Sequence, residues 1–413
     1  MQRYDTYKDS GVKWLGEIPS HWEVLALKHI LKSKKVIVGK YSSQYELLSL
    51  TLKGVVKRDM DNPEGKFPAS FDTYQAVEPN DFIFCNFDNE ETPRAVGLSP
   101  YHGMITGAYD VLYRTNPNFT DKFLIYYFLY IDDSKRFKPL YKGLRKTIPF
   151  DSFMSYKIPV PTLKEQDAMV AYLDAATAKI DEAIAQQQHM IDLLNERKKI
   201  VINHAVTKGF NPNVKYKETG IAWIGVIPEH WQLMQLRYTV TNHDNLRQPI
   251  TADQRERNNP QYDYYGASGV IDKIDHYNVD DKVLLIGEDG ANLVLRNLPL
   301  VYKAEGKFWV NNHAHILKPK GNDYDFMALV LEAADYTLFI TGSAQPKLSQ
   351  ANMNAVKLPI PPIKEQREIV AGIKPKLEKI DSFIEQHSSM VAFLEERKQI
   401  IINDVVTGKV KVV

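Results

Sequence analysis

One stretch of this 413-residue chain decides the fold: LKEQDAMVAYLDAATAKIDEAIAQQQHMIDLLNERKKIVINHAV, residues 163–206. Its apolar residues recur at alternating steps of three and four, the heptad pattern of a coiled-coil seam. The seam positions are Val170, Leu173, Thr177, Ile180, Ile184, Gln187, Ile191, Leu194, Lys198, Val201 and Ala205. The stretch predicts a long helix that packs against a second long helix. The alternative is a helix that packs only on its own globular domain.

The same pattern returns 200 residues later, in residues 363–406. The equivalent seam positions are Val370, Ile373, Leu377, Ile380, Ile384, His387, Val391, Leu394, Lys398, Ile401 and Val405. Eight of eleven seam positions are apolar in the first copy and nine in the second, so the two helices are expected to pair with each other. Pro375 has no N–H to donate, which predicts a kink or a restart near the beginning of the second helix.

A second repeat precedes each helix. The chain reads YKDSGVKWLGEIPSHW from Tyr7 and YKETGIAWIGVIPEHW from Tyr216, an offset of 209 residues. The identical spacing of the Gly, Trp, Ile-Pro and His-Trp elements indicates an internal duplication. The repeated tryptophans are expected to be packing anchors; they are Trp14, Trp22, Trp223 and Trp231.

The segments between these repeats differ almost completely, and the second is nine residues shorter. Short β-rich runs (residues 81–85, 110–114, 283–287 and 315–317) alternate with turn residues, and helical patterns follow over 121–130 and 325–336. The expected fold class is α+β, with two globular domains separated by two long helices. The expected divisions are 1–160, 161–209, 210–360 and 361–413.

The ends of the long helices have their own signals. Thr162 and Glu165 predict a capping box at the first helix, whereas Pro362 predicts a start with proline in the first turn of the second. Gly209 and Gly408 predict glycine caps at the C-terminal ends.

The composition is that of an ordinary soluble protein, 44% hydrophobic and 25% charged, and the length predicts two or more domains. No apolar run is long enough for a bilayer, and the N-terminal residues lack the hydrophobic region of a signal peptide. Cys85 is the single cysteine, which excludes an internal disulfide and a multi-cysteine zinc site. A cytoplasmic location is expected.

The net charge of +1 does not by itself indicate a nucleic-acid partner. Residues 23–157 contain 19 Lys and Arg against 16 Asp and Glu, and residues 229–357 contain 13 against 16. If DNA is the partner, its affinity must come from local basic patches, so binding by this chain alone is expected to be weak and sensitive to salt.

Taken together, the repeats resemble the specificity subunit of type I restriction-modification systems over nearly the whole chain. The resemblance rests on two repeated motifs. The first is GxxWxGxIPxHW, from Gly11 and again from Gly220. The second, which we call the exit, leads into each long helix and reads IPVPTLKEQ from Ile158 and LPIPPIKEQ from Leu358. Glu-Arg-Lys at 196–198 and 396–398 completes the set.

The resemblance implies two target recognition domains, an antiparallel helix pair with a pseudo-twofold axis, and recognition of a bipartite DNA site without catalysis. A seam from Val170 to Ala205 spans on the order of 50 Å, about one DNA turn or slightly more. The implied partners are double-stranded DNA, two modification subunits that dock on the outer helix surface, and restriction subunits. S-adenosylmethionine, ATP and Mg²⁺ would belong to those partners, and this chain would hold no cofactor.

One pair of segments is a candidate for reading bases. Counting back from the exits places residues 141–147 over residues 341–347, so that Arg145 matches Gln345. Arginine can pair with guanine and glutamine with adenine through two hydrogen bonds. Beside them, Lys142, Lys146 and Lys347 would contact phosphates, and Ser343 completes the candidates in this segment. The alternative for each residue is a solvated turn.

Two further stretches of the second domain, 264–269 and 311–315, are polar and rich in small residues. They add Tyr265, Ser268, Asn312 and His313 as candidates for contacts with bases or phosphates. Ordinary turns remain the alternative.

Other chemistries are weaker. Asp289, Glu305 and Lys307 could form a Mg²⁺-dependent nuclease site. Residues 258–262 (NNPQY) faintly resemble an adenine-methyltransferase motif but lack its second proline. His313 and His315 lack a third zinc ligand. A non-enzymatic alternative is a two-headed adaptor that binds peptides or RNA.

Overall fold

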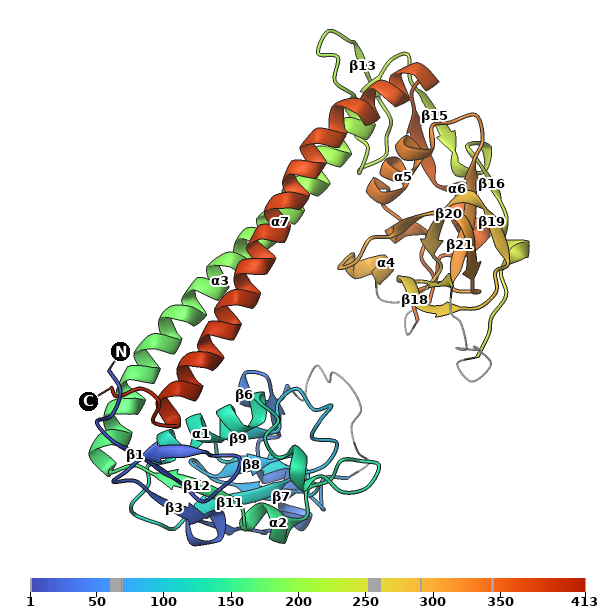
Figure 1. The fold of residues 1–413 in the computed structure, drawn as a ribbon. Helices are drawn as coiled ribbons and strands as arrows, with labels where there is room; N and C mark the ends of the chain where they lie inside the picture. The colour runs from blue at the N-terminus through green and yellow to red at the C-terminus, as the bar shows by residue number, and fades with distance from the viewer. Residues whose placement is uncertain are drawn as a thin grey trace. The chain divides into compact units, whose positions relative to one another are not determined.

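The computed structural model describes residues 2–59, 68, 70–251, 261–289, 292–342 and 345–412. The chain divides into two compact units, and each contains part of both long helices (Figure 1). Unit 1 consists of Met1–Gln187 with Ser389–Val413, and unit 2 consists of Gln188–Ser388. Strands and helices mix in both units, so the α+β class is confirmed.

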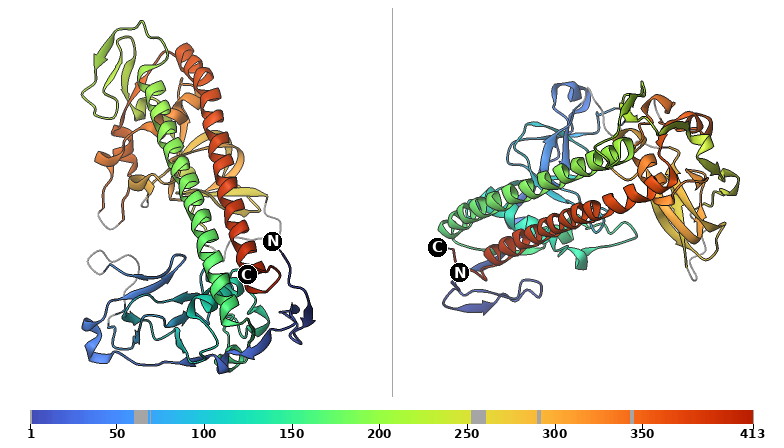
Figure 2. Two further views of the ribbon diagram at one scale, coloured as in Figure 1. Left: turned by 90° about the vertical axis from the view of Figure 1, so that its left-hand side faces the viewer. Right: turned by 90° about the horizontal axis from the view of Figure 1, so that it is seen from above.

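The long helices are α3 (Leu163–Lys208) and α7 (Ile363–Val406). All eleven predicted seam positions of each helix are buried or half-buried. In unit 1, Lys398 Nζ lies 2.6 Å from Asp181 Oδ1, and in unit 2 Lys198 Nζ lies 2.6 Å from Asp381 Oδ1. The same pair thus occurs in both units with the helices exchanged, as expected of an internal duplication. Within each unit the helix segments lie side by side and antiparallel, as expected (Figures 1 and 2).

The ends of the helices follow the sequence signals with one correction. The capping box is present, because Thr162 Oγ1 and N both donate to Glu165 Oε2 and Glu165 N donates back to Thr162 Oγ1. Pro362, however, precedes the first helical residue and caps the helix with its carbonyl, which accepts from Glu365 N and Gln366 N. Gly209 and Gly408 have φ of 66° and 74°, the left-handed conformation of a glycine cap.

Of the kink or restart expected at Pro375, the restart is wrong, because α7 runs through this residue without interruption. The carbonyl that loses its donor belongs to Ala371, four residues earlier. Both residues are exposed, so water can satisfy that carbonyl.

The repeated segments on either side of the two middle segments, together with the long helices, form what we call the frame. The frame has the same strand pairing in both units. The leading motif folds into β1–β2 in unit 1 and β13–β14 in unit 2, and a second strand of the frame pairs with the exit strand, β3 with β12 and β15 with β22. The bounds in unit 1 are β1 Tyr7–Asp9, β2 Glu17–Pro19, β3 Glu23–Ala26 and β12 Lys157–Val160. Those in unit 2 are β13 Tyr216–Glu218, β14 Val226–Pro228, β15 Gln232–Gln235 and β22 Lys357–Ile360. Lys157 lies opposite Ala26, and Lys357 lies opposite Gln235, so the register is also kept.

Trp22 and Trp231 are completely buried, which confirms them as packing anchors. They join the frame to the hydrophobic cores, which also contain residues of both long helices. Trp14 stacks on Tyr156 with 4.8 Å between ring centroids, and Trp223 is partly buried.

The globular parts lie between equivalent points of the frame, where Leu27 N donates to the Tyr156 carbonyl and Leu236 N donates to the Val356 carbonyl. We call residues Leu27–Tyr156 head 1 and residues Leu236–Val356 head 2. Head 1 contains a four-stranded antiparallel sheet in the order β4-β11-β8-β9, and head 2 contains the order β16-β21-β19-β20 with β17 and β18 added at one edge.

The pairing in the two sheets corresponds strand by strand, although the two sequences do not align. The bounds in head 1 are β4 Leu31–Ser33, β5 Leu48–Thr51, β6 Gly54–Lys57, β7 Gln75–Val77, β8 Phe82–Phe84, β9 Val96–Leu98, β10 Gly103–Ile105, β11 Asp110–Arg114, α1 Asp121–Asp133 and α2 Phe150–Met154. Those in head 2 are β16 Val240–Asn242, β17 Tyr262–Gly266, β18 Gly269–Ile274, β19 Val279–Gly287, α4 Asn292–Leu295, β20 Val301–Val310, β21 Ala314–Pro319, α5 Tyr324–Ala333 and α6 Gln350–Ala355.

Candidate nucleic-acid interface

The glutamine of each KEQ exit fixes the head to its long helix. Gln166 Oε1 accepts from Thr120 N, the N-cap residue of α1, and its amide donates to the carbonyls of Asn118 and Pro161. Gln366 Oε1 accepts from Asp323 N, the N-cap residue of α5. The frame therefore holds the two heads by the same buried contacts.

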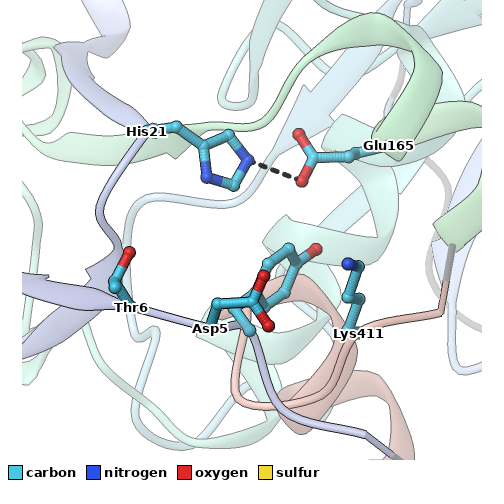
Figure 3. Close-up of a pocket in the computed structure, with 6 residues that line it drawn as sticks. Asp5, Thr6, His21, Glu165 and Lys411 are labelled. Carbon is cyan, nitrogen blue, oxygen red and sulfur yellow. Dashed lines mark hydrogen bonds and ion pairs between the residues drawn. The ribbon is translucent and has the colours of Figure 1, made fainter.

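A polar joint beside each exit glutamine is also duplicated. In unit 1, residues that include Asp5, His21 and Glu165 line a hollow of about 200 Å³. Within it, His21 Nε2 lies 2.9 Å from Glu165 Oε1 (Figure 3). In unit 2, His230 Nε2 lies 2.8 Å from Glu365 Oε2. Burial acts to raise the pKa of Glu165, but hydrogen bonds from Thr162, His21 and Trp22 outweigh it and lower that pKa. Because the same contact occurs in both units, we interpret it as a structural contact that joins the leading motif to the start of the long helix.

The candidate residues of head 1 lie on a tight hairpin, residues 142–147. Lys142 and Thr147 exchange backbone hydrogen bonds of 2.9 and 3.0 Å. All six residues are exposed, including Lys142, Arg145 and Lys146. The next residue, Ile148, donates its N–H to the Asn86 carbonyl in the loop that follows β8. The sheet therefore holds the base of the hairpin and leaves its tip in solvent.

Acidic side chains of the loop after β8 contact this hairpin. Asp88 Oδ2 lies 2.7 Å from Arg145 Nη2, and Glu90 Oε2 lies 3.3 Å from Lys146 Nζ. Hydrogen bonds from Lys138 and Lys146 lower the pKa of Glu90. Asp88 and Glu90 were not among the sequence candidates.

Head 2 has an equivalent hairpin that is closed by Thr341 and Lys347. Thr341 and Lys347 exchange backbone hydrogen bonds of 2.9 and 2.8 Å, and Leu348 N donates to the Glu288 carbonyl after β19. Gln345 is exposed, as Arg145 is in head 1. Ser343 lies outside the described residues.

The other candidates of head 2 come to the same end of the sheet. Asn312 and His313 are exposed in the turn between β20 and β21, and His313 Nδ1 lies 2.8 Å from Asp289 Oδ2. Ser268 is exposed in the turn between β17 and β18, beside the end of β19. Tyr265 differs, because it is half-buried and its ring packs edge-on against Phe308. The fold thus brings Lys347 and the two turns together, while the half-buried Tyr265 contacts the β20–β21 turn through its carbonyl, which accepts from Asn311 N.

A buried ionic cluster ties the head 2 hairpin to the sheet. Glu288, whose side chain is 10% exposed, accepts from Lys347 Nζ at 2.9 Å and from Arg247 Nη1. Burial acts to raise the pKa of Glu288, but these two cations outweigh it and lower that pKa. His315 is buried, with Nδ1 2.6 Å from Asp244 Oδ2 and Nε2 donating to the Leu348 carbonyl.

The rival sites do not assemble. Glu305 lies opposite Lys282 on the β19–β20 ladder. Lys282 precedes Asp289 by seven residues, which corresponds to roughly 23 Å along an extended strand. Glu305 and Asp289 are therefore too far apart to share a metal ion. Residues 258–260 of the methyltransferase-like motif lie outside the described residues. Within the described ranges, no group of three or more His, Cys, Asp or Glu side chains could hold a metal ion. No helix of that same part combines the length and apolarity needed to cross a bilayer.

Comparisons with known proteins agree with this architecture. Residues 106–189 and 228–388 match the type I restriction modification DNA specificity domain. A putative type I restriction enzyme MjaX specificity subunit of Methanocaldococcus jannaschii is 24% identical over 98% of both chains. A putative type I restriction enzyme specificity subunit of Haemophilus influenzae, S.HindORF215P, is 34% identical over 31% of this chain and 32% of that protein.

A chain from a solved structure on complex assembly and conformational transition of the type I R-M system covers 94% of this chain and 98% of its own length. It is 13% identical and superposes with a TM-score of 0.62, which supports the fold. Because the family model spans more than half of the sequence, the chain belongs to the family of type I restriction-modification specificity subunits.

Proposed function

We propose that this chain reads an interrupted DNA site, with one half read by each head, and directs adenine methylation or restriction by partner subunits. The observation that carries the proposal is the pair of equivalent hairpins, which lie at the same place on corresponding sheets but present different side chains, Arg145 and Gln345. Because arginine and glutamine favour different bases, two equivalent readers would recognise different half-sites.

Partner docking would use apolar side chains beside the seam. Met190, Leu193 and Ile200 of α3 are 42, 51 and 66% exposed, and Met390, Phe393 and Ile400 of α7 are 45, 56 and 50% exposed. These residues occupy equivalent positions, 200 residues apart, so the two stripes suit two copies of one helical partner. We propose that each stripe receives one modification subunit, which brings S-adenosylmethionine, while restriction subunits bring ATP and Mg²⁺.

The decisive experiment maps methylated adenines in cells with and without this gene. Loss of one bipartite motif with the gene would support the proposal, and an unchanged methylation pattern would reject it. In vitro, this chain alone is expected to bind DNA weakly and the complex with the modification subunit tightly and specifically.

The docking surface has a separate test. Leu193→Asp places a charge in one stripe and should reduce the yield of modification subunit that copurifies with the chain, and Phe393→Asp should do the same for the other stripe. Gln188→Asp is a matched control, because it places the same charge on an exposed residue of α3 that lies on a different helix face from the stripe.

The helices would also set the spacing of the half-sites. Seven residues inserted after Gln187 and seven after His387 keep the heptad phase and lengthen each helix by about 10 Å. The spacer of the methylated motif is then expected to grow by about three base pairs. An unchanged spacer would reject this role of the helices.

A further inference from the structure

The tip of the head 1 hairpin carries an apolar side chain that nothing in its surroundings explains. Leu144 is fully exposed, with a relative accessibility of 101%. It lies between Gly143 and Arg145, and the turn is fixed by left-handed φ angles of 68° at Gly143 and 46° at Lys146. An exposed leucine beside cationic side chains suits a partner surface that is both anionic and partly apolar.

Arg145 is held in a defined orientation by Asp88. Its Nε and Nη2 atoms lie 3.3 and 2.7 Å from Asp88 Oδ2, so the carboxylate occupies the Nε side of the guanidinium. Nη1 makes no hydrogen bond to any described residue. The guanidinium also lies over the ring of Phe87, with 5.3 Å to the ring centroid. The Nη1–Nη2 end of the guanidinium therefore stays available for a second acceptor pair.

The backbone reinforces this arrangement. Asp88 has a φ of 46°, and its N–H donates to the Arg145 carbonyl at 2.7 Å. The side chain and the main chain of Asp88 thus contact the same arginine. A position in the left-handed region accepts Asp or Asn more readily than most residues, which makes Asn a conservative replacement.

We propose that Asp88 is a positioning residue that directs the Nη1–Nη2 end of Arg145 at O6 and N7 of one guanine, and that Leu144 contacts the 5-methyl group of a thymine in the adjacent base pair. Guanine presents two acceptors in the major groove, and thymine presents the only methyl group there. The inference rests on the proposed DNA-reading function and adds the bases that head 1 recognises.

The test uses the full chain in complex with its modification subunits, and duplexes in which one functional group of one base in the methylated site is changed. Replacing guanine by 7-deazaguanine removes N7, and replacing thymine by deoxyuracil removes the methyl group. The wild-type complex should lose roughly tenfold in affinity at one guanine. It should lose about threefold to fourfold at the neighbouring thymine. Both losses should fall in one half-site.

Variants assign these losses to side chains. Arg145→Ala removes the guanidinium and should abolish the sensitivity to 7-deazaguanine. Leu144→Ala should abolish the sensitivity to deoxyuracil alone. Asp88→Asn should reduce the discrimination at guanine and leave that at thymine. Lys142→Ala is the control, because loss of a phosphate contact should weaken all duplexes equally.

Thermal unfolding of these variants should match the wild type, since Leu144 and Arg145 are exposed. Guanine discrimination unchanged in Arg145→Ala would overturn the inference for Arg145, and unchanged discrimination in Asp88→Asn would overturn the positioning role. Deoxyuracil sensitivity that persists in Leu144→Ala would overturn the thymine contact. In each case the complex would still bind its site specifically, whereas equal binding of all duplexes would overturn the proposed function itself.

Discussion

The two heads have the same sheet order and the same hairpin, but the polar residues beneath the hairpins differ. In head 1, Asn86 Nδ2 donates to Asp110 Oδ2 at 2.8 Å. At the equivalent place in head 2, Glu288 and His315 belong to an ionic cluster with Asp244, Arg247 and Lys347. The duplicated backbone therefore tolerates a single hydrogen bond to a carboxyl group in one copy and an ionic cluster in the other.

The largest effect of this difference is expected for removal of Glu288. Glu288→Ala leaves Arg247 and Lys347 without their shared acceptor, and the unfolding free energy of head 2 should fall by about 3 kcal/mol. Asn86→Ala in head 1 removes one hydrogen bond and should cost about 1 kcal/mol. Chemical denaturation of both variants measures the contrast, and equal losses would show that the two supports are equivalent.

The frame should behave in the opposite way, with equal effects in both units. Gln166→Ala and Gln366→Ala each leave the N–H of an N-cap residue and a buried proline carbonyl without a partner, and each should cost about 2 kcal/mol. Hydrogen exchange of α1 and α5 would locate the loss. A cost confined to one unit would contradict a duplicated frame.

The reciprocal pairs between the long helices should contribute less. Lys198→Asp faces Asp381 with a like charge and should destabilise unit 2 by about 0.5 kcal/mol, because the pair is exposed. The double variant Lys198→Asp with Asp381→Lys should restore the stability. The same exchange at Lys398 and Asp181 should give the same result in unit 1, as measured by thermal unfolding at low salt.

The smallest effect is expected for the pH dependence of the two supports. Burial raises the pKa of Asp110, so its contribution to stability is present at low pH and is lost as the pH rises through the folded-state pKa. Asp110→Asn should therefore stabilise head 1 at neutral pH, and this gain should disappear as the pH falls toward 3.8, the ordinary value.

In head 2 the sign is reversed. Burial acts to raise the pKa of Asp244, but the contact with His315 and the hydrogen bond from Ile316 N outweigh it and lower that pKa. This contribution is present above the ordinary value and is lost as the pH falls through the lowered one. As the pH falls through the acid range, the contribution of Asp244 to the stability of head 2 should be lost while that of Asp110 to head 1 is gained. Parallel pH profiles for the unfolding of the two heads would contradict this.

The frame could be predicted from the sequence because the chain contains two copies of it, which can be compared with each other. A heptad seam repeated after 200 residues identified both helices, and the repeated Trp and KEQ elements marked where the heads join them. The common sheet was not predictable, since its strands are short and the two middle segments differ in length. Proline was the weakest signal, because the exposure of Ala371 and Pro375 decides whether a helix tolerates it.

The candidate site was predictable only where it is local. The hairpins were found because they lie at a fixed distance before the exits. Asp88 could not be found in this way, because it meets Arg145 across 57 residues and does so through the pairing of β8 with the sheet. Glu288 and Arg247 were missed for the same reason, since 41 residues separate them. Leu144 was within the predicted segment, but only its exposure distinguishes it from a core leucine.

One measurement tests whether the heads are independent readers on a twofold frame. Replacing residues 27–156 by a copy of residues 236–356 joins the chain at the equivalent hydrogen-bonded points and gives both units head 2. Methylated adenines would then be mapped in cells that express this variant with the modification subunits. We predict an inverted repeat of the half-site that head 2 reads, with a spacer of unchanged length. Methylation of the original asymmetric site, or of a direct repeat, would contradict the account.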